Sequence, residues 1–328
     1  MELLGYAAFF LTLALTYAVV ALGLNVQWGQ TGLFNVGVAG FVGIGAYTSA
    51  IMTSPDAADR IGGFGLPVAA GWIAAFVVAA IVSVMLGWLT LRLRADYLAI
   101  ATFGFSVAVQ LAALNLERLT GGPFGLGFVP RPFASFAGDP LAFGLLNLAV
   151  VALVVLLVWR TLEHLARSPW GRVLRAIRED EEAARALGKS ATRFRLQAFA
   201  IGGGIMGLGG ALQAHFIGFI APENYLPTLT FQVWAMLIVG GAGNNLGAIL
   251  GAVVVWGLWS GSSVLIGAFV DPAEQARAAA LQIVVIGTAL CLILLLRPRG
   301  LLAEVMTHRR ANSGPSLQTG PARDRRSA

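Results

Sequence analysis

Few side chains in this 328-residue sequence could take part in catalysis or hold a metal ion. His164, His215 and His308 are isolated from one another, and the sequence contains neither a His-Glu-x-x-His nor a Gly-x-Ser-x-Gly motif. Cys291 is the only cysteine, so no disulfide can form within the chain. We therefore predict no catalytic residue, no metal site and no cofactor bound by this chain, and we do not expect an enzyme.

Amide and hydroxyl side chains occur instead inside two glycine-rich apolar stretches, residues 29–47 and residues 240–251, one in each half of the chain. Glycine lets helices pack closely and also lets them unwind, and paired interrupted segments in two halves of a membrane protein indicate a transport path. Close packing alone is the alternative, and we favour it for most of these glycines. The candidate path residues are Thr31, Asn35, Asn244 and Asn245.

The composition is that of a membrane protein. Hydrophobic residues make up 57% of the chain and charged residues 12%, with a mean hydropathy of +0.78, whereas about 25% of the residues in a soluble domain are charged. The apolar segments are nearly free of ionisable residues, which argues against a transporter coupled to protons or ions. We predict an all-α, polytopic integral membrane protein.

Nine apolar segments are candidate membrane helices, because about 20 residues are needed to cross the apolar core of a bilayer. The second and seventh are rich in glycine, so we expect them to be broken or re-entrant, and a total of about nine spans, between eight and ten, is predicted. The segments are residues 3–24, 32–52, 66–91, 97–116, 141–159, 196–217, 229–243, 246–268 and 278–296.

The basic residues predict an orientation. If the charged loop, defined here as residues 160–195, is cytoplasmic, alternation of the spans places 18 of the 22 Lys and Arg residues inside and the N-terminus outside. This positive-inside bias explains the basic pI, and since no nucleic-acid-binding motif is present, we expect no nucleic acid partner. The four arginines left outside are Arg60, Arg118, Arg131 and Arg277.

The charged loop begins with the signature of a helix. Ser168 can cap free backbone N–H groups and Pro169 fits the first helical position. Trp170, Leu174 and Ile177 then follow at helical spacing and form one apolar stripe, while arginines occupy other faces. This pattern predicts an amphipathic surface helix.

A second short helix should follow. Asp180 can cap it, Glu181 and Glu182 would occupy its positively polarised first turn, and Gly188 can adopt the left-handed conformation just past its end. Ion pairs within such helices contribute only about 0.2–0.5 kcal/mol each. The flanking membrane helices or a partner surface must therefore hold the loop, and we predict that it is a docking element.

At Glu182-Ala183-Ala184, with Gly188 four residues later, the charged loop resembles the cytoplasmic EAA loop of ABC importer permeases. The wider sequence SPWGRVLRAIREDEEAARALG, residues 168–188, is similar to the permease subunits of branched-chain amino acid importers. The Ile-x-Leu-Pro ending of the general motif is absent. Further similar stretches are residues 96–102, 119–126 and 297–301, so that the likeness extends over nearly the whole chain.

The resemblance implies an ABC importer permease of a bacterial plasma (inner) membrane that moves branched-chain or related small amino acids into the cytoplasm. The chain has no Walker A motif, so ATP would be hydrolysed by a separate ATPase subunit. A second permease subunit, forming a heterodimer, an extracytoplasmic solute-binding protein and membrane lipid are the other implied partners. The residues expected to couple the loop to the ATPase are Trp170, Leu174, Ile177, Glu182, Ala183, Ala184 and Gly188.

Two alternatives remain open at this point. An importer of the same family could carry urea, an amide or another small solute, because a separate binding protein would set most of the selectivity. A stand-alone channel or facilitator is the alternative from another class, although it would not need a docking loop. In either case we expect residues 1–302 to form the membrane domain and residues 303–328 to form a disordered, basic cytoplasmic tail.

Overall fold

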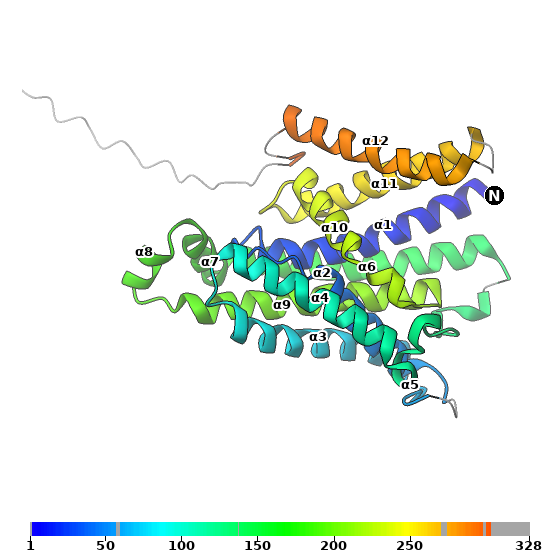
Figure 1. Cartoon of the computed structure of the whole chain (residues 1–328), viewed down its shortest axis with the longest axis horizontal. Helices are drawn as coiled ribbons and strands as arrows, with labels where there is room; N and C mark the ends of the chain where they lie inside the picture. Colours follow the sequence, from blue (N-terminus) through cyan, green and yellow to red (C-terminus); the bar gives the residue numbers. More distant parts are fainter. Residues whose placement is uncertain (1, 57–59, 137, 270–273, 298–299, 303–328) are drawn as a thin grey trace, which may run out of the picture.

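The computed structural model describes residues 2–56, 60–136, 138–269, 274–297 and 300–302, and the predicted tail lies outside these described residues. The described chain is helical, with one isolated antiparallel bridge between Leu126 and Ile220. Figure 1 shows the long helices running side by side, with α7 and α8 at one end of the bundle and the N-terminus at the other. The all-α prediction is confirmed for this part of the chain.

Each of the nine apolar segments corresponds to one helix. Six helices are long and apolar enough to cross a membrane, so the polytopic character is confirmed, whereas α2, α10 and the apolar part of α12 are shorter, and the count of nine spans stays a prediction. The helices are α1 Glu2–Gln27, α2 Val38–Thr53, α3 Val68–Thr90, α4 Ala95–Asn115, α6 Pro140–Arg167, α9 Ala191–Ile217, α10 Pro227–Gly240, α11 Asn245–Phe269 and α12 Gln275–Leu296.

Helix α9 lies at the centre of the bundle, where it packs most extensively against α3, α2 and α1. Its glycines make this possible. A Cβ atom on Gly23 of α1 would lie 2.6 Å from Gly202 O of α9, and one on Gly204 would lie 2.9 Å from the ring of Phe76 in α3. Gly207 of α9 lies directly against the backbone of Gly45 in α2. The three neighbouring helices can therefore approach α9 only because side chains are missing at the contacts.

Each glycine-rich stretch contains non-helical residues, but α2 and α10 are themselves unbroken, so the predicted breaks lie beside these helices and a re-entrant course stays a prediction. Helix α1 ends at Gln27, and residues 28–37 form a turn and an irregular segment before α2 begins. Residues 241–244 separate α10 from α11. We call residues 28–37 the first interrupted segment and residues 241–244 the second, and both lie near the end of the bundle that carries α7 and α8.

The chain that follows α12 returns to the second interrupted segment. Leu301 N donates to Val239 O at 2.8 Å, and Leu302 N donates to Gly240 O at 3.0 Å. The last carbonyl groups of a helix have no partner within the helix. Residues 300–302 thus provide partners for the end of α10.

Loops close the opposite end of the bundle. The Leu126 and Ile220 backbones exchange two hydrogen bonds of 2.8 and 3.0 Å, and the chain turns after Thr120, with Gly121 at φ +75°. His215 is fully buried, and its ring nitrogens lie 2.8 Å from Ser49 Oγ and 2.6 Å from Pro130 O. His215 therefore joins α2, α9 and the loop around Pro130 inside the protein.

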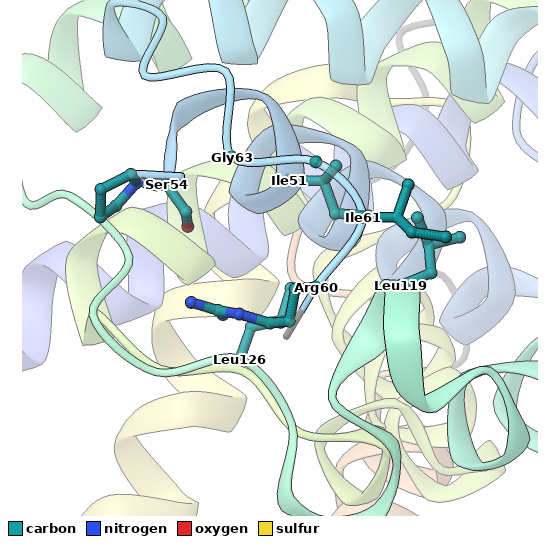
Figure 2. A pocket seen from close by; sticks show the side chains of 9 residues that line it. Ile51, Ser54, Arg60, Ile61, Gly63, Leu119 and Leu126 are labelled. Carbon is teal, nitrogen blue, oxygen red and sulfur yellow. The ribbon is translucent and has the colours of Figure 1, made fainter. Parts of the chain in front are cut away.

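Between these loops lies a small cavity of about 10 Å³, which Figure 2 shows from close by. Its wall includes Ser54 and Arg60 from the loop after α2, and Leu119 and Leu126 from the loop after α4. A cavity needs about 10–15 Å³ to hold one water molecule. An amino acid cannot enter it.

The α9 contacts predict a large effect of one methyl-bearing substitution. Gly23→Val should lower the unfolding temperature in detergent, because its Cβ would meet the α9 backbone and overpacking costs about 1–3 kcal/mol. Gly104→Val is the matched control, since the space around Gly104 of α4 is open within 4 Å. Equal unfolding temperatures for the two variants would contradict this account of the packing.

The predicted orientation can be tested at the two ends of the bundle. In a Cys291→Ser background, Leu187→Cys next to α8 should react with a membrane-impermeant thiol reagent only from the cytoplasm. Phe124→Cys in the loop after α4 should react only from outside. Both side chains are well exposed, at 80% and 87% respectively. The reverse labelling pattern would show that the orientation is inverted.

Candidate functional site

The charged loop folds into the two short helices expected from the sequence, α7 Pro169–Glu179 and α8 Glu181–Ala186. Ser168 occupies the N-cap position of α7, but its side chain makes no capping bond, and Ser168 Oγ donates instead to Leu165 O at 2.7 Å. The predicted serine cap is therefore wrong, because Ser168 Oγ points toward the Leu165 carbonyl of α6 and not toward the N–H groups at the start of α7. The location of the helix start is confirmed.

The apolar stripe of α7 faces the protein itself. Leu174 and Ile177 are 0% and 1% exposed, and Ile177 packs with Ala184 of α8 and Ala191 of α9. Trp170 is half-buried, and its Nε1 donates to Gln197 Oε1 at 2.9 Å. Of the two possibilities that the sequence left open, the flanking helices or a partner surface, the structure shows the first: the chain itself covers the stripe, and these residues anchor the charged loop to the bundle.

Helix α8 is capped and oriented by charged side chains. Asp180 accepts a hydrogen bond from Ala183 N at 2.9 Å, as predicted, and Gly188 adopts a φ of +75° just past the helix end. Glu181 pairs with Arg185 at 2.5 Å and with Arg195 of α9 at 2.6 Å. The pair with Arg195 fastens α8 to the start of α9.

One face of the charged loop remains open. We define the α8 face as Glu182, Ala183, Leu187 and Gly188, all exposed, with Leu187 at 80%. Ala184, in contrast, is only 4% exposed and lies beneath it. Of the residues predicted to couple the loop to a partner, the structure thus brings Glu182, Ala183 and Gly188 to an accessible surface. Leu187 was missed, because a single leucine at a helix end carries no periodicity.

The first interrupted segment is held by a buried polar network. Asn35 Nδ2 donates to Gln27 Oε1 at 2.6 Å, and Asn35 Oδ1 accepts from Gly37 N at 2.7 Å. Gln27 Nε2 donates to Phe199 O of α9 at 2.8 Å, and Thr31 Oγ1 donates to Gln27 O. Asn35, Gln27 and Thr31 are all 0% exposed. These side chains hold the non-helical backbone in place.

A second network joins the two interrupted segments. Asn25 Oδ1 accepts from Gly243 N at 2.8 Å, and Asn25 Nδ2 donates to Asn245 Oδ1 at 2.9 Å. Asn245 Nδ2 in turn donates to Glu163 Oε2 in α6 at 3.1 Å. Gln30 Nε2 donates to Gly243 O at 3.2 Å. The two glycine-rich stretches are therefore in direct contact, through Gln30 and Gly243.

Of the four candidate path residues, three are buried in this structure and Asn244 is half-buried. Thr31, Asn35 and Asn245 are buried and hydrogen-bonded, and Asn244 Oδ1 accepts from the backbone N–H groups of Leu246 and Gly247 at the start of α11. Larger surface crevices, of about 540 and 590 Å³, lie along the two ends of α6 and include none of the four. Their role in transport stays a prediction.

Sequence analysis missed several members of these networks. Asn25 and Gln27 give a signal, because two amides end an otherwise apolar helix. Glu163 and Arg178 give none, since in a run rich in charges they are indistinguishable from solvated residues. The fold alone brings them to the interrupted segments.

Residues 6–294 match the sequence profile of the family described as the branched-chain amino acid transport system permease component. The chain belongs to this family. The permease is 36% identical over 269 residues to the high-affinity branched-chain amino acid transport system permease protein LivM of Salmonella typhimurium. The aligned region covers 74% of the permease and 60% of that relative, so the chain spans less than two thirds of the relative's length.

Two further relatives extend the comparison. The probable branched-chain amino acid transport permease protein LivM of Methanocaldococcus jannaschii is 28% identical, with 72% of the permease and 75% of the relative aligned. The high-affinity branched-chain amino acid transport system permease protein LivH of Escherichia coli is 26% identical, with 74% and 80% aligned. No solved structure matches the permease.

The burial of Asn35 predicts that its first role is structural. Asn35→Leu should lower the unfolding temperature of the permease in detergent, because Gln27 Oε1 and Gly37 N would lose their partner, at about 1–3 kcal/mol for each buried group left unsatisfied. Asn115→Leu is the control, since Asn115 is exposed and bonds only to Leu111 O, one turn away in α4. An unchanged unfolding temperature for Asn35→Leu would contradict this role.

Proposed function

We propose that this chain is a membrane subunit of an ABC importer that moves branched-chain or related small amino acids into the cytoplasm. The carrying observation is the family match over residues 6–294. The named relatives are permease proteins of branched-chain amino acid transport systems, which supports the same substrate class here. The chain itself binds no nucleotide in this proposal, and a separate subunit hydrolyses ATP.

The α8 face is the surface that we assign to the ATPase. It projects from the end of the bundle in Figure 1, and the anchoring of α7 by Leu174 and Ile177 means that force on α8 reaches the membrane helices. An exposed leucine between two small residues, Ala186 and Gly188, suits a shallow groove on a partner. In this proposal, the docking surface is held on the bundle by the residues packed beneath it: Trp170, Leu174, Ile177 and Ala184.

Two further partners belong to the proposal. Escherichia coli has both a LivM and a LivH protein named as permease proteins of a high-affinity branched-chain amino acid transport system, and this chain aligns with both. We infer that it also works beside a second, related permease. A solute-binding protein outside the membrane would deliver the amino acid, and the charged loop would face the cytoplasm.

Reconstitution tests this function. The permease, a second permease and the ATPase are placed in vesicles, and uptake of labelled leucine, isoleucine and valine is measured with ATP and the binding protein. We expect uptake only when every subunit and ATP are present. Uptake by this chain alone would instead establish a channel or facilitator, and uptake of urea or an amide in place of the amino acids would change the substrate class.

The docking surface gives a separate prediction. Leu187→Asn should weaken the association of the ATPase by about 10- to 100-fold, because burial of a leucine side chain contributes about 1.5–3 kcal/mol. Co-purification and substrate-stimulated ATP hydrolysis measure the effect. Leu116→Asn is the control, since Leu116 is 51% exposed at the opposite end of the bundle. Wild-type association of Leu187→Asn would remove the α8 face from the interface.

A further inference from the structure

Arg178 connects the charged loop to the first interrupted segment. It lies in the last turn of α7, and its Nη1 donates to Gly29 O in the turn that follows α1. Its aliphatic stem lies over Gly32, where a Cβ atom would come within 3.2 Å of Arg178 Cγ. Gly32 has a φ of +71°, so this turn has a shape that other residues rarely adopt. Arg178 and the turn therefore fit each other by a hydrogen bond and by packing.

The position suits an arginine. Gly29 lies just past the C-terminal end of α1, where the backbone carbonyl groups lack helical partners and the helix dipole is negative. A guanidinium group stays charged and has five N–H donors in a fixed plane, so it can hold such a carbonyl in a defined direction. Arg178 is thus a directional contact, unlike the apolar contacts of Leu174 and Ile177 in the same helix.

The contact continues to the second interrupted segment. Gln30, the next residue after Gly29, donates from Nε2 to Gly243 O at 3.2 Å. Gly243 N donates to Asn25 Oδ1 at 2.8 Å, which returns the path to the last turns of α1. A displacement of the Arg178 side chain therefore acts on the first interrupted segment through Gly29 and on the second through Gln30.

We propose that Arg178 is a positioning residue that transmits movement of the α8 face to the two interrupted segments during transport. This inference rests on the proposed function, and it concerns a residue outside the docking surface. Apolar contacts are non-directional, so the buried stripe of α7 can carry the loop without specifying the arrangement of the interruptions. The Arg178 hydrogen bond is directional and specifies where Gly29 lies relative to α7.

A purely structural role for Arg178 makes a different prediction. If it only stabilised the end of α1, its removal would lower the amount of assembled complex, and each assembled complex would transport normally. If Arg178 transmits movement, the assembled complex hydrolyses ATP without moving substrate. The ratio of substrate taken up to ATP hydrolysed separates the two roles.

The experiment uses the full importer in vesicles, with its ATPase, second permease and binding protein. Arg178→Gln keeps a polar side chain of similar reach but removes the charge and the fork of donors. We expect it to retain the ATPase on co-purification and to lower uptake per ATP at least tenfold. Arg178→Lys, which keeps the charge and a donor, should recover part of the ratio.

Arg172→Gln is the matched control, because Arg172 lies on the same helix, is exposed, and its guanidinium bonds to Arg167 O at the end of α6. It should keep the wild-type ratio. A wild-type ratio in assembled Arg178→Gln complexes would overturn the inference, even if fewer complexes assembled.

Gln30→Leu makes the test independent of how well Arg178→Gln assembles. It removes the hydrogen bond from Gln30 to Gly243 O, which links the residue after Gly29 to the second interrupted segment. A wild-type ratio for Gln30→Leu would also overturn the inference. A wild-type importer that showed no ATP-driven uptake would instead overturn the proposed function, and with it the role of Arg178 in transmitting movement. The two failures are therefore distinguishable.

Discussion

The close approach of α9 to α1, α2 and α3 is the constraint on which the rest of the permease depends. Glycine in α9 and in its neighbours lets backbones come into contact, as at Gly23 with Gly202 and at Gly45 with Gly207. Because lipid is as apolar as leucine, such packing rather than the hydrophobic effect must hold membrane helices together. The same contacts place Gln27 beside Phe199 O, so the helix that centres the fold also supports the first interrupted segment.

Much of the fold follows from local signals in the sequence. Long apolar runs located the helices, and Pro169, Asp180 and Gly188 marked the ends of α7 and α8, because caps and left-handed turns involve only neighbouring residues. The ends of α2 and α10 were less predictable. Trp234 Nε1 donates to Asn35 O at 2.9 Å, so the interruption before α2 relies on a side chain 199 residues away.

The location of the functional site was predictable from the sequence, whereas the surface that each face of α7 contacts was less so. An amphipathic stripe shows that one face of α7 is buried, but it does not say whether the cover is a partner or the same chain. The interrupted segments were found from glycine and amide composition, whereas Glu163 and Arg178 became visible only once the fold brought α6 and α7 beside them. Charged residues at loop ends have the same sequence signature whether water or a backbone carbonyl solvates them.

The attachment of residues 300–302 to the end of α10 has a consequence for biosynthesis. Val239 O and Gly240 O receive their partners from a segment made about 60 residues later, after α11 and α12. Ribosomes add about 5–20 residues per second, and domains begin to fold while synthesis continues. The end of α10 therefore emerges from the ribosome several seconds before its backbone partners exist, and the nascent permease must carry this incomplete junction in the membrane until translation of the last helix has ended.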